Sequence, residues 1–237
     1  MGVTADEVVH LTAGYSYWKL NDYRLQPENG TLPMRIAALP LMALDLRWPP
    51  ADDPWWRHAL GNHVGDNFFF NLGNPLDRML LAARTGIALL GAFTLWLIWR
   101  WTRGLFGTTA GFCALALAVF CPALLAHGAL ATSDMAITAA LLAAVTAFWR
   151  LLHLVTWWRI ALAILAGGAV LLAKMSGLLA APMLALLLVF RWLRPAPLIL
   201  RLGGSAHRLR RRGAIIAVTS ALTVATAAAS LGVVWGG

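Results

Sequence analysis

The distribution of apolar residues divides the chain near residue 78, where a mixed polar segment gives way to almost continuous apolar sequence. A helix needs about 20 residues to cross the hydrocarbon core of a bilayer. Six apolar stretches suited to this follow, near 79–99, 108–127, 134–154, 158–174, 176–193 and 214–235. They are apolar on every side, so no amphipathic period can be read in them. The pattern predicts an all-α polytopic membrane protein, with a transmembrane bundle of about six spans over 79–237.

Two details of this bundle follow from the sequence. The fourth and fifth stretches meet at Lys174, Ser176 and Gly177. A lysine inside apolar sequence is costly in a bilayer, so we expect a re-entrant corner there rather than one long helix. The last stretch ends abruptly at Trp235-Gly236-Gly237, and from this we expect the bundle to be truncated at its C-terminus.

Residues 1–78 are predicted to form a separate region with juxtamembrane helices. The first 32 residues are too polar for a span and predict a short helix, a turn and a loop. Residues 33–46 are apolar but too few to cross a bilayer, which favours a helix at the membrane interface. Residues 47–78 are rich in Trp, Pro, Asn, Asp and Gly. They predict a loop whose aromatic side chains rest at the membrane interface.

Composition and charge argue against a soluble protein. Apolar residues make up 60% of the 237 and charged residues 12%, whereas a soluble domain carries about 25% charged residues. The net charge of +9 resembles that of a nucleic-acid-binding protein, but seven arginines lie between Arg191 and Arg212, beside apolar sequence. This placement is typical of a cytoplasmic membrane loop, so no nucleic-acid partner is expected. Cys113 and Cys121 share one apolar stretch and predict core thiols.

The same charges predict the orientation of the chain. Arginines follow the first, third and fifth apolar stretches, and if those loops are cytoplasmic, 11 of the 19 basic residues lie inside. All ten Asp and Glu residues then lie outside. We therefore expect a single extracytoplasmic face to collect residues 1–78, Asp134 and Lys174.

The first acidic residues of the chain, Asp6 and Glu7, are candidates for acid–base chemistry. They are adjacent, so they cannot share one helix face as a paired dyad. His10 stands one turn further along a helix, where it can contact a carboxylate or join it as a metal ligand. Alternatively, Thr4 or Asp6 caps a short helix and Glu7 interacts with its dipole. Both interpretations stay open.

Three further ionisable residues occur within or beside the predicted spans. Asp134 begins the third span, where it is either a helix cap or a functional acid. Lys174 and Arg84 lie in apolar sequence, where each must either extend to the interface or meet an anionic group such as a lipid phosphate. Two cations on the acid-bearing face suit an anionic lipid headgroup.

A set of motifs then runs in order along the chain. The set is Asp6-Glu7, His10, Gly14 with Tyr17, Asp22-Tyr23, Glu28 with Leu32, Ala38-Leu39-Pro40-Leu41, LDRMLLAARTG, LLAHGALATSDMAITAALL and LLAKMSGLL. Together the motifs resemble those of the dolichyl-phosphate-mannose protein mannosyltransferases and their bacterial relatives. These are polyprenyl-phosphate-dependent GT-C glycosyltransferases. The resemblance implies a GT-C-type transmembrane helix bundle in a bacterial inner (plasma) membrane, with the active site on the extracytoplasmic side.

The resemblance also implies a reaction. A sugar moves from a polyprenyl-phosphate-linked donor to an acceptor hydroxyl on a protein, lipid or polysaccharide, with inversion at the anomeric carbon. Asp6 matches the general base, with Glu7 beside it. Arg84 and Lys174 match positions that hold the donor phosphate.

Three residues would support this site. Glu28 matches an acid that in some relatives ligates a divalent metal ion, which is the one cofactor implied. His10 is a supporting or ligand residue, and Asp134 orders the same loop.

A second interpretation is a non-catalytic or truncated relative that binds polyprenyl-phosphate lipid or a membrane partner. It is favoured by one difference from the family pattern. The family's Glu-His-Pro-Pro reads Glu28-Asn29-Gly30-Thr31 here, so the rigid Pro-Pro turn is lost and a flexible Asn-Gly pair follows the acid. A transporter would need charges at mid-depth or paired broken helices, and only Lys174 approaches this.

Overall fold

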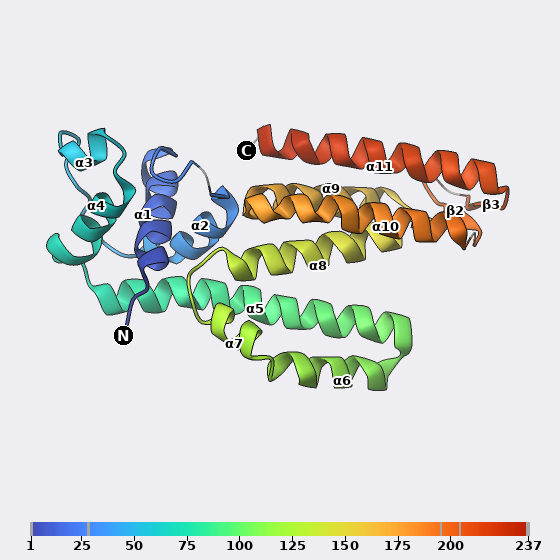
Figure 1. Cartoon of the computed structure of the whole chain (residues 1–237), viewed down its shortest axis with the longest axis horizontal. Helices are drawn as coiled ribbons and strands as arrows, with labels where there is room; N and C mark the ends of the chain where they lie inside the picture. Colours follow the sequence, from blue (N-terminus) through green and yellow to red (C-terminus); the bar gives the residue numbers. More distant parts are fainter. Residues whose placement is uncertain (1, 28, 195, 204, 236–237) are drawn as a thin grey trace. The chain divides into compact units, whose positions relative to one another are not determined.

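The computed structural model describes residues 2–27, 29–194, 196–203 and 205–235, and these residues are mainly helical (Figure 1). Contacts divide the chain into two compact units, Met1–Ala139 and Ala140–Gly237, with the boundary inside helix α8 (Asp134–Leu151). Helices satisfy every backbone hydrogen bond within one segment, which apolar sequence in a bilayer requires. The prediction of an all-α polytopic membrane protein is confirmed.

Within the described part of the chain, four helical segments are long and apolar enough to cross a membrane. They are α5 (Leu76–Phe106), α8, the segment Met175–Leu193 and α11 (Arg212–Trp235). A fifth span arises if α6 (Thr108–Val119) and α7 (Pro122–Gly128) count as one, although they are bent by 64°. Pro122 has no backbone N–H to donate, which explains why the predicted helix over 108–127 breaks just before it.

The predicted corner at Lys174 is present. Helix α9 (Trp157–Ala173) has 17 residues and is shorter than the spans above. It ends at Lys174, whose backbone is extended, and a short 3-10 helix, η3 (Met175–Leu179), leads into α10 (Ala180–Leu193). A Cβ built on Gly177 would lie 2.5 Å from the carbonyl oxygen of Val170. Only glycine allows the chain to turn so closely onto the end of α9.

The N-terminal part of the first unit consists of short helices packed around α1 (Ala5–Leu20). These are α2 (Thr31–Ala38), η1 (Leu39–Ala43), α3 (Pro54–Arg57), α4 (Gly61–Asp66) and the π-type turn η2 (Asn67–Asn71). The prediction of a plain loop over 47–78 was therefore wrong in part.

Several aromatic side chains of this region are buried rather than placed at a membrane interface. Phe68 and Phe69 are fully buried, and the ring of Trp48 lies 5.5 Å from Tyr15 and 5.1 Å from Phe68, between centroids. Such ring contacts add to the free energy gained by burying the apolar area itself. The aromatics of this segment thus form a core with α1, which the local composition did not predict.

Helices α1 and α2 approach each other at Gly14. A Cβ at this position would lie 2.2 Å from the carbonyl oxygen of Met34 and 2.7 Å from the Cβ of Ala38. The absence of a side chain at Gly14 therefore sets the distance between α1 and α2. The same contact determines which face of α1 packs against α2.

The second unit packs α9 against α11 through small residues. A Cβ on Gly167 would meet Ser230, and one on Gly168 would lie 2.8 Å from Val233 Cγ1. The Ser230 hydroxyl donates to the carbonyl oxygen of Ile164 at 3.0 Å. Small residues and interhelical hydroxyl bonds are the usual means of helix association in bilayers.

A three-stranded sheet closes one end of this unit. Strand β1 (Leu154–Val155) pairs in parallel with β2 (Leu198–Leu200), and β2 pairs in antiparallel fashion with β3 (His207–Leu209). The sheet joins the end of α8, the start of α9 and the start of α11. Its inner residues, such as Val155 and Leu198, are buried.

Replacing Gly14 with alanine is expected to destabilise the first unit by about 1–3 kcal/mol, because the new methyl group meets a backbone oxygen that cannot move alone. Thermal unfolding in detergent measures the effect. Gly104→Ala is the matched control, since nothing lies within 4 Å of a Cβ at that helical position. Equal stability of the two variants would contradict the close α1–α2 contact.

Candidate functional site

A buried carboxylate joins three segments of the first unit. The Glu7 side chain is fully buried. Its Oε1 accepts hydrogen bonds from Arg84 Nε at 2.8 Å and from the backbone N–H of Ala131 at 3.0 Å. Its Oε2 accepts from Arg84 Nη2 at 2.8 Å and from the backbone N–H and hydroxyl of Thr4 at 3.1 and 3.2 Å. Glu7 therefore holds α1, α5 and the loop before α8 together.

The local sequence explains how Glu7 reaches this position. Thr4 is the N-cap of α1, and its hydroxyl accepts a hydrogen bond from the Glu7 N–H at 3.3 Å. Because Glu7 is the third residue of the helix, its side chain returns to the Thr4 backbone and completes a capping box. The capping interpretation is thus confirmed for Thr4, and Glu7 extends it into the tertiary structure.

Electrostatics keep this carboxyl group ionised. Burial raises the pKa of Glu7, but the hydrogen bonds from Arg84, Ala131 and Thr4 outweigh burial, and the pKa lies below its ordinary value. The Arg84 guanidinium also donates through Nη2 to the carbonyl oxygen of Gly2 at 2.7 Å. The sequence alone identified no anionic partner for Arg84, which lies in an apolar stretch. The structure shows that this partner is the Glu7 carboxylate.

Asp6 has a different environment from its neighbour. It lies in the first turn of α1 with an exposed side chain, and no hydrogen bond or ion pair joins it to the described part of the chain. His10, one turn further along, is buried. The structure thus separates the two adjacent acids, one held within the protein and one directed to the surface.

The loop that contacts Glu7 also carries Asp134. The Asp134 carboxylate begins α8 and lies 3.5 Å from His127 Nδ1, with both side chains partly exposed. Thr132 donates to the same carboxylate at 3.4 Å. Both contacts lie within the segment from 127 to 134, which also presents the Ala131 N–H to Glu7.

Two predicted site residues are not part of this cluster as described for the first unit. Lys174 belongs to the second unit, at the corner between α9 and η3. Glu28 lies outside the described residues. Among the residues that the structure describes, no group of three His, Cys, Asp or Glu is arranged to hold a metal ion.

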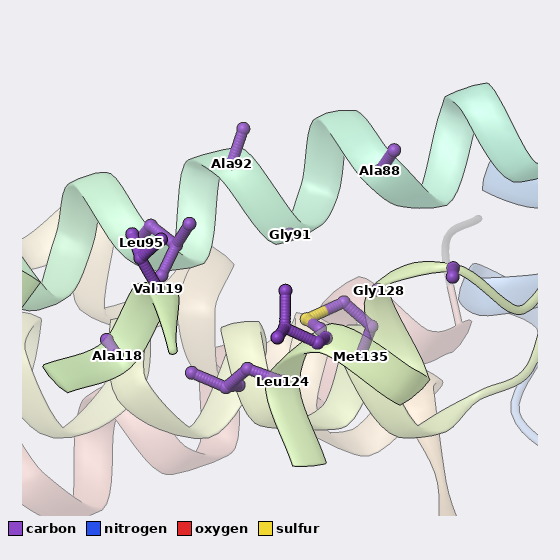
Figure 2. Close-up of a pocket in the computed structure, with 11 residues that line it drawn as sticks. Ala88, Gly91, Ala92, Leu95, Ala118, Val119, Leu124, Gly128 and Met135 are labelled. Carbon is purple, nitrogen blue, oxygen red and sulfur yellow. The ribbon is translucent and has the colours of Figure 1, made fainter. Parts of the chain in front are cut away.

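Figure 2 shows an apolar cavity of the first unit, of about 270 Å³, between α5 and the α6–α7 pair. Ala88, Gly91, Ala92 and Leu95 line it from α5, and Leu124, Gly128 and Met135 line the opposite side. No lining side chain is titratable, so the cavity suits hydrocarbon rather than proton transfer. An apolar cavity of about 260 Å³ lies in the second unit, where Thr223, Thr226 and Ser230 provide its hydroxyl groups.

A more polar cavity, of about 480 Å³, lies between residues 24–27 and 59–63, and its lining includes Arg24, Gln26, Asn62 and His63. A Cβ on Gly61, which also lines it, would lie 3.6 Å from Val9 Cγ1. Val9 follows Asp6 by about one helical turn, so Gly61 connects the wall of this cavity to the first half of α1.

The sequence contained one signal for the Glu7–Arg84 pair. An arginine in an apolar helix requires a nearby anion, and Glu7 is one of the ten acids predicted on the same side of the membrane. The spacing of 77 residues did not identify the partner.

Glu7→Gln is expected to lower the free energy of unfolding by about 3 kcal/mol, because it leaves Arg84 without its charge partner in a partly buried site. Thermal unfolding in detergent at neutral pH measures this. Asp6→Asn removes the adjacent, exposed charge and is expected to leave stability within about 0.5 kcal/mol of the wild type. Equal losses from both variants would show that Glu7 has no special structural role.

The pH dependence has a defined sign. Because folding lowers the pKa of Glu7, the ionised group stabilises the protein fully above its unfolded pKa of about 4.3. This stabilisation is lost as the pH falls from there through the folded pKa. The difference in stability between the wild type and Glu7→Gln should therefore shrink in acid, and a constant difference would contradict the assignment.

Comparison with known proteins identifies the family. The sequence model described as dolichyl-phosphate-mannose-protein mannosyltransferase matches residues 67–226, about two thirds of the chain. The match includes Arg84, Asp134 and Lys174 and begins after Asp6 and Glu7. The comparisons with curated proteins and with solved structures gave no match. With its membrane-length helices, the chain is an integral membrane protein of a glycosyltransferase type that uses a lipid-linked sugar donor, and it belongs to the dolichyl-phosphate-mannose-protein mannosyltransferase family.

Proposed function

We propose that the chain transfers a sugar from a polyprenyl-phosphate-linked donor to an acceptor hydroxyl on the extracytoplasmic face, with Asp6 as general base. The main support is the contrast between the two adjacent acids. Glu7 is buried and accepts five hydrogen bonds from neighbouring segments, whereas Asp6 is exposed on the same helical turn. A carboxylate fixed to a rigid turn and open to solvent suits a general base.

In this mechanism the Asp6 carboxylate takes the proton of the acceptor hydroxyl as its oxygen attacks the anomeric carbon. The bond from that carbon to the phosphate oxygen breaks, and polyprenyl phosphate leaves with the electron pair. Attack from the side opposite the leaving group inverts the anomeric centre. Glu7 then acts as a positioning residue for Asp6, because its contacts fix the first turn of α1.

The leaving phosphate needs cationic stabilisation more than a proton. We assign this role to Arg84 and Lys174. Glu7 binds Nε and Nη2 of Arg84, while Nη1 makes no hydrogen bond to the described residues. The Arg84 side chain is 19% exposed, so Nη1 can approach a phosphate oxygen. Glu28 is proposed as a ligand if a divalent metal ion takes part. The metal ion would then help to stabilise the negative charge of the same leaving phosphate.

The acceptor would enter near the polar cavity between residues 24–27 and 59–63. Its amide, imidazole and guanidinium groups can hydrogen-bond to hydroxyl-bearing molecules. Val9 lies beside Gly61, which lines this cavity, so an acceptor bound there would be near the part of α1 that follows Asp6. The acceptor can be a protein, a lipid or a polysaccharide in this proposal.

Asp6→Asn is expected to lower turnover by about 10²–10⁴-fold, since amide nitrogen and oxygen cannot accept the proton. The measurement is release of polyprenyl phosphate from a labelled polyprenyl-phosphosugar by membranes that contain the chain. Asp52→Asn, another exposed acid of the first unit, is the matched control and should keep full turnover.

Full turnover of Asp6→Asn would overturn the assignment of the base. If neither the wild type nor the variant turns over the donor while both bind it, the chain is a non-catalytic relative that binds polyprenyl-phosphate lipid. The loss of the Pro-Pro turn, where this chain has Gly30-Thr31, favours that second function.

The proposed orientation is tested by cysteine labelling in a background where Cys113 and Cys121 are replaced by alanine. Asn62→Cys should react with a membrane-impermeant maleimide added to intact cells, because residues 1–78 are proposed to lie outside. Ser205→Cys should react only after the membrane is opened. The reverse pattern would overturn both the orientation and the side of the proposed reaction.

A further inference from the structure

The second unit carries an unbalanced positive surface at one end. Residues 140–237 contain no Asp or Glu. Five arginines at the sheet end of the unit have exposed side chains, namely Arg201, Arg208, Arg210, Arg211 and Arg212. No side chain of these five makes a hydrogen bond or an ion pair with the described part of the chain. We refer to them as the arginine surface.

The three-stranded sheet gives this surface a defined structure. Arg208 pairs with Ile199 across the β2–β3 ladder, and β2 in turn pairs with β1. Arg201 donates its backbone N–H to the carbonyl oxygen of Val155 at 2.8 Å. Arg212 begins α11. The guanidinium groups therefore extend from an ordered platform rather than from a free coil.

Two exposed indole rings adjoin the arginine surface. Trp157 and Trp158, at the start of α9, are 67% and 71% exposed. The Trp157 Nε1–H donates to the carbonyl oxygen of Leu202 at 2.9 Å, which fixes the ring beside the β2–β3 connection. Exposed tryptophan next to apolar helices is typical of the level of lipid headgroups in a bilayer.

The arrangement of the helices places this surface at a membrane boundary. Helix α9 begins, α10 ends and α11 begins at the sheet, as Figure 1 shows within this unit. These helices are apolar. The end that carries the arginines and the indole rings is therefore the boundary between the apolar and the charged surface of the unit. A surface of five cations at that depth faces phosphates of the lipid leaflet rather than open solvent.

We propose that the arginine surface, together with Trp157 and Trp158, is a binding site for the headgroups of anionic phospholipids. No carboxylate of the second unit can neutralise the five guanidinium groups, so the counter-charge comes from outside it. Guanidinium groups bind phosphate oxygens through paired hydrogen bonds, and the indoles enter the headgroup region. This site is independent of the proposed transfer reaction.

The test uses the full chain in a neutral detergent and follows its thermal unfolding during titration with phosphatidylglycerol or phosphatidylcholine. Phosphatidylglycerol should stabilise the wild type, and phosphatidylcholine should do so much less. The triple variant Arg208→Gln/Arg210→Gln/Arg211→Gln should need on the order of 100-fold more phosphatidylglycerol for the same stabilisation. The control Arg57→Gln/Arg78→Gln removes two exposed charges from the first unit and should respond as the wild type does.

Two further measurements keep the proposal falsifiable if the glutamine variant folds poorly. The variant with lysine at the same three positions should keep the response, and high salt should weaken the response of the wild type. Equal stabilisation by the two lipids would overturn the proposal. It would also be overturned if inorganic phosphate alone, or a homopolymeric RNA, reproduced the effect of phosphatidylglycerol.

Discussion

The structure of the first unit depends on one buried carboxylate, that of Glu7, whose lost hydration must be replaced by other interactions. Glu7 is removed from water, and an ionised group in that position is tolerated only when charge and hydrogen bonds replace hydration. Arg84 supplies the charge, and Thr4 and Ala131 supply backbone N–H groups. These donors lie in three separate segments, so satisfying the carboxylate also fixes α1, α5 and the loop before α8 relative to one another.

This constraint gives the neighbouring acids Glu7 and Asp6 different environments. A side chain that accepts five hydrogen bonds is a poor proton acceptor for a substrate, because its lone pairs are already used. Its neighbour on an exposed helix position shares the rigidity without sharing the contacts. Arg84 uses Nε and Nη2 for Glu7, and its Nη1 makes no hydrogen bond to the described residues. In the proposed mechanism, structural and reactive roles therefore lie on adjacent groups.

The sequence predicted the features that are set by the bilayer around the chain, such as the apolar helices. It did not predict the features that depend on contacts between distant residues. Apolar stretches predicted the helices, because in a bilayer a helix satisfies the polar groups of its own backbone. The family match over residues 67–226 agrees with the motifs recognised in that part of the sequence. The break before Pro122 was not predicted, because the apolar sequence continues on both sides of it. The core around Phe68, with Trp48 packed against it, and the pairing of Glu7 with Arg84 were not predicted either, because composition and spacing do not say which distant residues meet. The functional roles assigned to the candidate site residues, from Asp6 and Arg84 to Lys174, stay predictions.

The hydrogen bond from Ala131 to Glu7 has a consequence for the order in which the protein is made. It joins residues 124 positions apart, and α5, α6 and α7 all lie between them in the chain. Helix α1 is synthesised before α5, so Glu7 gains Arg84 only after α5 has been made and Ala131 only after the α6–α7 pair has followed. Until then the carboxylate must stay in water or bind elsewhere. Helix α1 is therefore among the last segments of its unit to reach its final contacts, although it is made before the segments that it contacts.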